Sequence, residues 1–105
     1  MARVRQLLKR LRNMLEQSGE HYFVNDIDAA LAADDTVLWS FLTSNELWGG
    51  AGSIADQGCG PSRETRRPLE QLLAELGREQ ITLGRTNART QTWTSVFEQW
   101  HAQNI

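Results

Sequence analysis

The first pattern in the chain is a stripe of apolar residues between residues 3 and 18. The stripe consists of Val4, Leu7, Leu8, Leu11, Met14 and Leu15. Steps of three and four residues place these side chains on one face of a helix and the basic residues on the opposite face. Gly19 follows, and glycine commonly ends a helix. The pattern therefore predicts an amphipathic helix over residues 3–18.

Two further apolar segments meet at an acidic break. The first contains Phe23, Ile27, Ala30 and Leu31. It predicts a helix over residues 20–33, although Asn25 or Asp26 could act as the N-cap of a later start. Residues 34–36, Asp-Asp-Thr, offer a break and a new N-cap. The segment "VLWSFLT" at residues 37–43 suits a strand or a helix, and its helical surroundings favour a helix to about residue 47.

The C-terminal half carries two more helical patterns. Residues 66–79 form the first, with Pro68 suited to its first turn. Residues 90–103 form the second, and Asn87 or Thr90 could cap its start. Its apolar stripe consists of Trp93, Val96, Phe97 and Trp100. Residues 80–89 are expected to form a turn that pivots at Gly84.

These patterns define the fold class. No segment alternates apolar and polar residues as a half-buried strand would. A chain of 105 residues has the size of one domain with one core. We therefore predict a single all-α domain over residues 1–105, a bundle of four to six helices with a glycine-rich corner near residues 49–60.

The corner, "ELWGGAGSIADQGCG" at residues 46–60, holds five of the eight glycines. A phosphate-binding loop would need a lysine directly after its last glycine, and the only lysine of the chain is Lys9. Residues 53–56, Ser-Ile-Ala-Asp, instead have the form of a capping box. We expect residues 49–52 to adopt positive φ angles and to start a short helix, which Gly58, Gly60 and Pro61 then end.

The same corner carries a resemblance. "LWGGAGSIADQ", followed by "LGREQ" and "TQTWTSVFEQW", resembles small bacterial proteins of unknown function that share a Gly-Gly-x-Gly-Ser-x-x-Asp corner. Several such families look like immunity proteins, which are encoded beside secreted or contact-dependent toxins. The resemblance covers residues 47–57 and implies a helical, non-enzymatic inhibitor. It carries no established functional residue over to this chain.

Charge is distributed unevenly along the chain. Its net charge is -2, but no Lys or Arg occurs between Arg12 and Arg63. That stretch contains the acids Glu16, Glu20, Asp26, Asp28, Asp34, Asp35, Glu46 and Asp56. The first twelve residues contain the bases Arg3, Arg5, Lys9, Arg10 and Arg12. Such blocks indicate the kind of partner rather than the fold.

Candidate catalytic and metal-binding residues are sparse. His21, His101 and Cys59 are the only imidazoles and thiol, and their spacing matches no zinc motif. The acid pairs at residues 26/28 and 34/35 fall at expected helix starts, where they would cap amides. We predict no metal, no cofactor and no catalytic residue. An enzyme would need a pocket that gathers Asp56, His21 or His101.

Other classes are less consistent with the sequence. The longest apolar run is far shorter than the ~20 residues that span a bilayer, so no membrane association is expected. The N-terminus lacks the apolar core of a signal peptide, and a single cysteine fits a reducing cytoplasm. The basic first helix makes nucleic-acid binding or regulation the alternative function. A pI of about 5.6 disfavours it.

We therefore predict a cytoplasmic immunity- or antitoxin-like protein that binds and occludes a cognate basic bacterial toxin. The expected partner-binding residues are Asp26, Asp28, Asp34, Asp35 and Glu46, with Trp48 as a partly exposed apolar anchor. This prediction requires the carboxylates to form one continuous electronegative surface without arginine partners. No feature of the sequence specifies an oligomeric state.

Overall fold

The computed structural model describes residues 1–19, 21–50, 52–57 and 63–103. These residues form helices joined by turns, with no strand, as the all-α prediction requires. The helices are α1 (Ala2–Gln17), α2 (His21–Ala32), α3 (Asp35–Leu42), α4 (Ile54–Gln57), α5 (Arg63–Leu83) and α6 (Thr90–Ala102). Gly58, Cys59, Gly60 and Pro61 lie outside the described residues, and so does the end predicted for the short helix.

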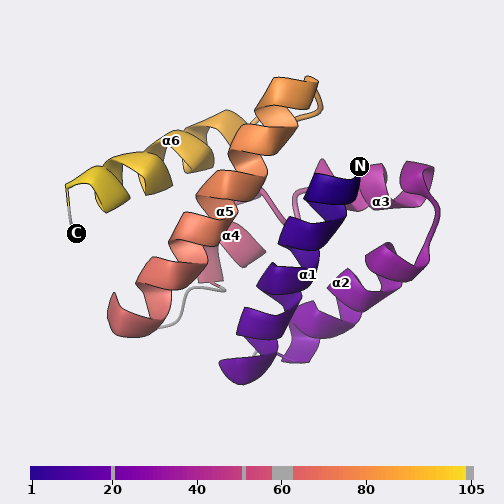
Figure 1. Ribbon diagram of the computed structural model, residues 1–105, viewed down its shortest axis with the longest axis horizontal. Coiled ribbons are helices and arrows are strands. Elements are labelled where there is room, and N and C mark those ends of the chain that lie inside the picture. The colour runs from indigo at the N-terminus through magenta and orange to yellow at the C-terminus, as the bar shows by residue number, and fades with distance from the viewer. Residues whose placement is uncertain (20, 51, 58–62, 104–105) are drawn as a thin grey trace.

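The helices surround one hydrophobic core. α1 packs against α2 and α5, α5 packs against α6, and α2 packs against α3. Figure 1 shows α1 and α5 side by side in the centre, with α6 on one flank and α2 and α3 on the other. The apolar stripe of α1 is fully buried except for Met14, which is partly exposed. The sequence pattern therefore identified the face on which α1 packs.

The helix boundaries differ from the predictions in the middle of the chain. α2 begins at His21, so neither Asn25 nor Asp26 is its N-cap. Asp34 caps α3 as predicted, because its Oδ1 accepts from the amide of Val37 at 3.0 Å. α3 ends at Leu42 instead of continuing to residue 47, and the following residues form turns.

α5 is longer than predicted at both ends. It starts at Arg63, so Pro68 lies inside the helix and not in its first turn. It also continues to Leu83, and the turn that follows pivots at Gly84 as expected, with φ of +72°. Gly77 lies where α5 meets α6: a Cβ there would come within 1.9 Å of Thr94 Oγ1. The absence of a side chain at Gly77 permits this close crossing.

The glycine corner contains a close backbone contact and is not a run of residues with left-handed φ angles. Among its described glycines only Gly52 has a positive φ, +91°, so the prediction is wrong for Gly49 and Gly50. A Cβ at Gly49 would lie 2.0 Å from the carbonyl oxygen of Asn45. The backbone at residue 49 passes so close to the carbonyl of Asn45 that only glycine fits there.

The capping box at the start of α4 is confirmed in its first half. The amide of Asp56 donates to Ser53 Oγ at 3.2 Å, as a capping box requires. The Asp56 carboxylate accepts from the amide of Gly52, also at 3.2 Å, and not from that of Ser53. The reciprocal bond thus reaches one residue further back than predicted and links Gly52 to α4.

Candidate functional site

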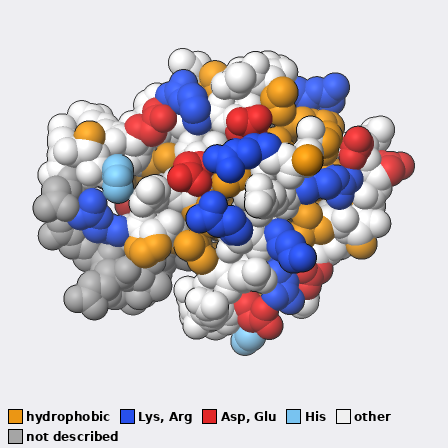
Figure 2. Space-filling model, in the orientation of Figure 1, with side chains coloured by type: hydrophobic (Ala, Val, Ile, Leu, Met, Phe, Trp, Pro, Cys, Tyr) orange, Lys and Arg blue, Asp and Glu red, His pale blue; other side chains and the backbone are white. Residues whose placement is uncertain are grey.

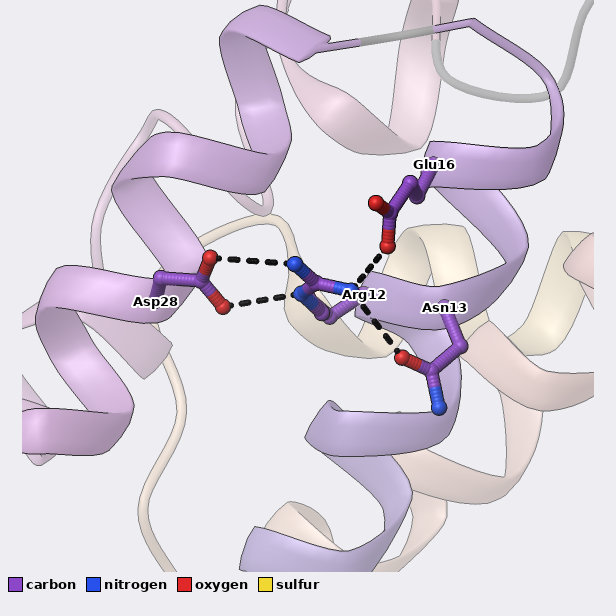
Figure 3. Close-up of polar contacts among 4 residues, drawn as sticks. All are labelled: Arg12, Asn13, Glu16 and Asp28. Carbon is purple, nitrogen blue, oxygen red and sulfur yellow. Dashed lines mark hydrogen bonds and ion pairs between the residues drawn. The ribbon is translucent and has the colours of Figure 1, made fainter.

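Asp28 is bound by an arginine of the first helix. Arg12 of α1 donates through Nε and Nη2 to the two carboxylate oxygens of Asp28 on α2, at 2.9 and 3.3 Å. Figure 3 shows the Arg12 guanidinium between Asp28 on one side and Glu16 and Asn13 of its own helix on the other. These contacts raise the pKa of Arg12, first through the hydrogen bond to Asp28. Asp28 is therefore not an unopposed carboxylate.

Asp35 is neutralised in the same way. Arg5 of α1 donates to Asp35 Oδ1 at 2.7 Å, and its guanidinium also donates to the carbonyls of Leu31 and Ala33. The ion pair thus fastens α1 to the junction between α2 and α3. The expectation of acidic side chains without arginine partners is wrong for Asp28 and Asp35, because Arg12 and Arg5 of α1 reach these two carboxylates. Asp34 remains exposed as the cap of α3.

Asp26 and Glu46 form a pair of carboxyl groups. Asp26 lies on α2, and Glu46 lies in the turn between α3 and α4. The pKa of Glu46 is raised, first by a hydrogen bond that its carboxyl shares with that of Asp26, then by burial and by the charge of Asp26. Such a bond needs a proton on one carboxyl. Asp26 Oδ2 is buried within the protein and accepts no hydrogen bond from the described residues.

No positive side chain of the described residues compensates this pair. The ion pairs within the described ranges involve other acids, namely Glu16, Asp28, Asp35, Glu70, Glu75 and Glu98. Glu46 is exposed and Asp26 is partly exposed, so a group from outside can reach them. Of the predicted acidic residues, the structure brings together these two.

Trp48 is not an exposed anchor. Its side chain is 0% exposed, and its Nε1 donates to Gln80 Oε1 of α5 at 2.9 Å. The prediction of a partly exposed Trp48 is therefore wrong. The reason is tertiary, because the partner of the indole lies on a helix that is distant in sequence.

Sequence reasoning missed the buried Gln80, and it missed the contacts that Asn87 makes with the segment after α3. Gln80, also 0% exposed, donates through Nε2 to the carbonyls of Leu42 and Arg85. Asn87 donates to the carbonyls of Ser44 and Trp48. One signal for Gln80 was present, because it lies four residues after Leu76 and so continues the buried stripe of α5. Together these amides hold the α5–α6 loop against the segment after α3.

Asn87 also caps α6. Its Oδ1 accepts from the amides of Arg89 and Thr90, at 2.8 and 3.0 Å. The N-cap position of α6 is Arg89, whose side chain makes no capping bond, and Asn87, one of the two predicted candidates, supplies the side-chain acceptor from two residues earlier. Thr90 contributes as well, because its hydroxyl accepts from the amide of Asn87. The Asn87 side chain therefore binds the first amides of α6 and also the carbonyls of Ser44 and Trp48 in the segment after α3.

The bases of α1 are largely opposed by acids. Arg5 and Arg12 form the ion pairs described above, and Arg10 lies 3.8 Å from Glu75 of α5. Figure 2 shows basic and acidic side chains interspersed over the face that α1 and α5 present. The two bases of α1 that form no ion pair within the described part of the chain are Arg3 and Lys9.

The described residues contain no cluster of potential metal ligands. Within them, no group of three or more His, Cys, Asp or Glu side chains could hold a metal ion. His21 and His101 are both exposed. In the same described ranges no helix combines the length and apolarity that a bilayer crossing requires. The site that remains is the carboxyl pair of Asp26 and Glu46.

The fold and these contacts define an all-α protein built on one core. Comparison with family models, with curated proteins and with solved structures finds no match. Any function must therefore be argued from the residues themselves.

Proposed function

We propose that this protein is a non-enzymatic, immunity- or antitoxin-like protein that binds and occludes a cognate basic toxin in the bacterial cytoplasm. The observation that supports this proposal is the carboxyl pair of Asp26 and Glu46. Two acids in contact repel each other when both are ionised, and no described base relieves the repulsion. A guanidinium or ammonium group from a partner would do so.

A basic side chain of the partner would gain two carboxylates at once. It would favour the ionised form of Glu46, whose side chain is exposed beside Asp26. Asp34, exposed at the start of α3, adds a further negative charge. Charge of this kind raises association rates and selects partners more than it adds raw affinity. Occlusion by such contact needs no chemistry from this protein.

The nucleic-acid alternative has less support. It relies on the bases of α1, and Arg5 and Arg12 already donate to carboxylates of α2 and α3. A phosphate backbone would have to displace Asp28 and Asp35 from these arginines. Binding to a basic protein requires no such exchange.

The test uses the purified toxin encoded by the neighbouring gene and two matched double variants. Asp26→Asn with Glu46→Gln removes the pair, and because it also removes their mutual repulsion, the variant should fold as stably as wild type, which urea unfolding checks. Glu75→Gln with Glu79→Gln removes the same charge from α5. We expect the first variant to weaken binding by about tenfold or more and to lose its protection of toxin-expressing cells, while the control keeps both.

The remaining outcomes are equally clear. Equal affinities for the two variants would refute the role of the carboxyl pair. If far less than one molecule of this protein per toxin molecule abolished the toxin activity, this protein would be acting catalytically. That result would refute the non-enzymatic mechanism. Retention of the protein on RNA or DNA, lost in Arg10→Ala with Arg12→Ala, would favour the nucleic-acid alternative.

A further inference from the structure

A second surface lies along α3, and neither Asp26 nor Glu46 lines it. A groove of about 750 Å³ runs between α3 and the loop that joins α5 to α6. Its lining includes Thr36 and Trp39 of α3, Thr43 directly after that helix, and Gly84, Arg85 and Thr86 of the loop. It therefore brings together segments that are about forty residues apart in the chain.

The centre of this groove is an arginine stacked on a tryptophan. The Arg85 guanidinium carbon lies 5.0 Å from the centroid of the Trp39 ring, within the range of a cation–π contact. Trp39 is partly exposed and Arg85 is exposed. No carboxylate of the described residues forms an ion pair with Arg85. The stacking orients the guanidinium while its N–H groups stay available.

The acidic side chain that lines the groove is already paired. Asp35 also lines it, but Arg5 binds the Asp35 carboxylate at 2.7 Å. Arg85 therefore leaves the groove with a net positive charge, in contrast to the carboxyl pair. The hydroxyls of Thr36 and Thr86 make no hydrogen bond within the described part of the chain and can donate to an anion.

Both walls of the groove are held by the same buried side chain. Gln80 Nε2 donates to the carbonyl of Leu42 at the end of α3 and to the carbonyl of Arg85 in the loop, at 2.9 and 3.1 Å. The amide of Arg85 in turn donates to the carbonyl of Gln80 at 2.9 Å. The groove is thus formed before any partner arrives, which lowers the entropic cost of binding.

We infer that this groove binds an acidic peptide segment of a partner protein. A carboxylate would pair with Arg85 and the threonine hydroxyls, and an adjacent apolar side chain would lie on Trp39. Trp and Arg are the residues most enriched at the energetic centres of protein interfaces. A polyanion such as RNA fits less well, because Arg85 is the only basic side chain among the described residues that line the groove, whereas a phosphate backbone is bound by several bases at once.

This inference does not depend on the proposed function, since it concerns a different surface and a partner segment of opposite charge. The two therefore fail separately. Loss of toxin binding in the variant of the carboxyl pair says nothing of the groove, and a groove that binds no acid leaves the carboxyl pair untouched.

The test titrates isotope-labelled protein with a short blocked peptide of alternating Glu and Leu, monitored by the backbone amide and indole signals. We expect shifts confined to the Trp39 indole and to the amides of Gly84, Arg85 and Thr86. The variant Arg85→Ala should weaken binding by about tenfold or more, as loss of a charge-assisted hydrogen bond implies. Arg10→Ala removes the same charge from α1 and should leave the affinity unchanged.

Three results would overturn the inference. The first is an absence of shifts at these residues up to millimolar peptide. The second is equal weakening by Arg85→Ala and Arg10→Ala, which would indicate general charge attraction. The third is tighter binding of a single-stranded oligonucleotide than of the peptide at the same residues, which would assign the groove to nucleic acid. A peptide with Gln in place of Glu should fail to bind.

Discussion

Replacement of Gly49 by alanine should destabilise the protein far more than replacement of its neighbour Gly50. A Cβ at Gly49 would lie 2.0 Å from the Asn45 oxygen and 2.9 Å from the Asn45 carbonyl carbon, which are both backbone atoms. The chain must therefore shift. At Gly50 the nearest atom is Arg89 Cζ at 3.9 Å, an ordinary contact.

The magnitude follows from what the shift would break. Gly49 O accepts from Trp93 Nε1 at 2.8 Å, and Trp48 O accepts from Asn87 Nδ2 at 3.0 Å. Each such bond contributes about 1 kcal/mol net, and overpacking adds about 1–3 kcal/mol. We expect Gly49→Ala to cost roughly 2–4 kcal/mol. Gly50→Ala, whose φ is not positive, should be neutral or stabilise by up to about 1 kcal/mol.

The assay is urea unfolding of wild type and both variants, followed by far-UV circular dichroism and tryptophan emission. Thermal unfolding offers a second measure, in which Gly49→Ala should lower Tm by about 10 °C or more. Free energies of unfolding that agree within about 0.5 kcal/mol for the two variants would refute the reasoning. They would mean that the contact between the new Cβ and Asn45 relaxes at no cost.

Three further predictions concern other contacts. Gly77→Ala should cost about 1–3 kcal/mol in urea unfolding because its Cβ would overlap Thr94 Oγ1, and Thr94→Ala in the same chain should recover part of that loss. Gln80→Leu should cost about 3 kcal/mol and alter near-UV circular dichroism, since the Trp48 indole and two carbonyls lose their partner. The pKa of Glu46 is raised above its ordinary 4.5, so the folded chain binds this proton more tightly than the unfolded chain and stability falls as pH rises through the raised pKa. Glu46→Gln should therefore match wild type at about pH 4 and exceed its stability at about pH 7, by an amount that solvent screening of this exposed group keeps small, and a constant difference across that range would contradict the interpretation.

The sequence alone was sufficient for the class of fold and for most helix positions. The stripe of α1 and the cap at Asp34 depend on spacing and on interactions between neighbours in the chain, which a sequence displays directly. The same is true of Gly19, whose φ of +84° follows the end of α1. Helix ends in the interior were less accurate, because packing extended α5 beyond what local preference indicated.

The character of the candidate sites was decided by tertiary structure. A carboxylate is free or neutralised according to which helix lies beside it, and the sequence does not state that α1 places Arg5 and Arg12 against Asp35 and Asp28. The burial of Trp48 depends in the same way on Gln80, a residue of another helix. Spacing along one helix determines which side chains share a face, but only the assembled bundle determines what that face meets.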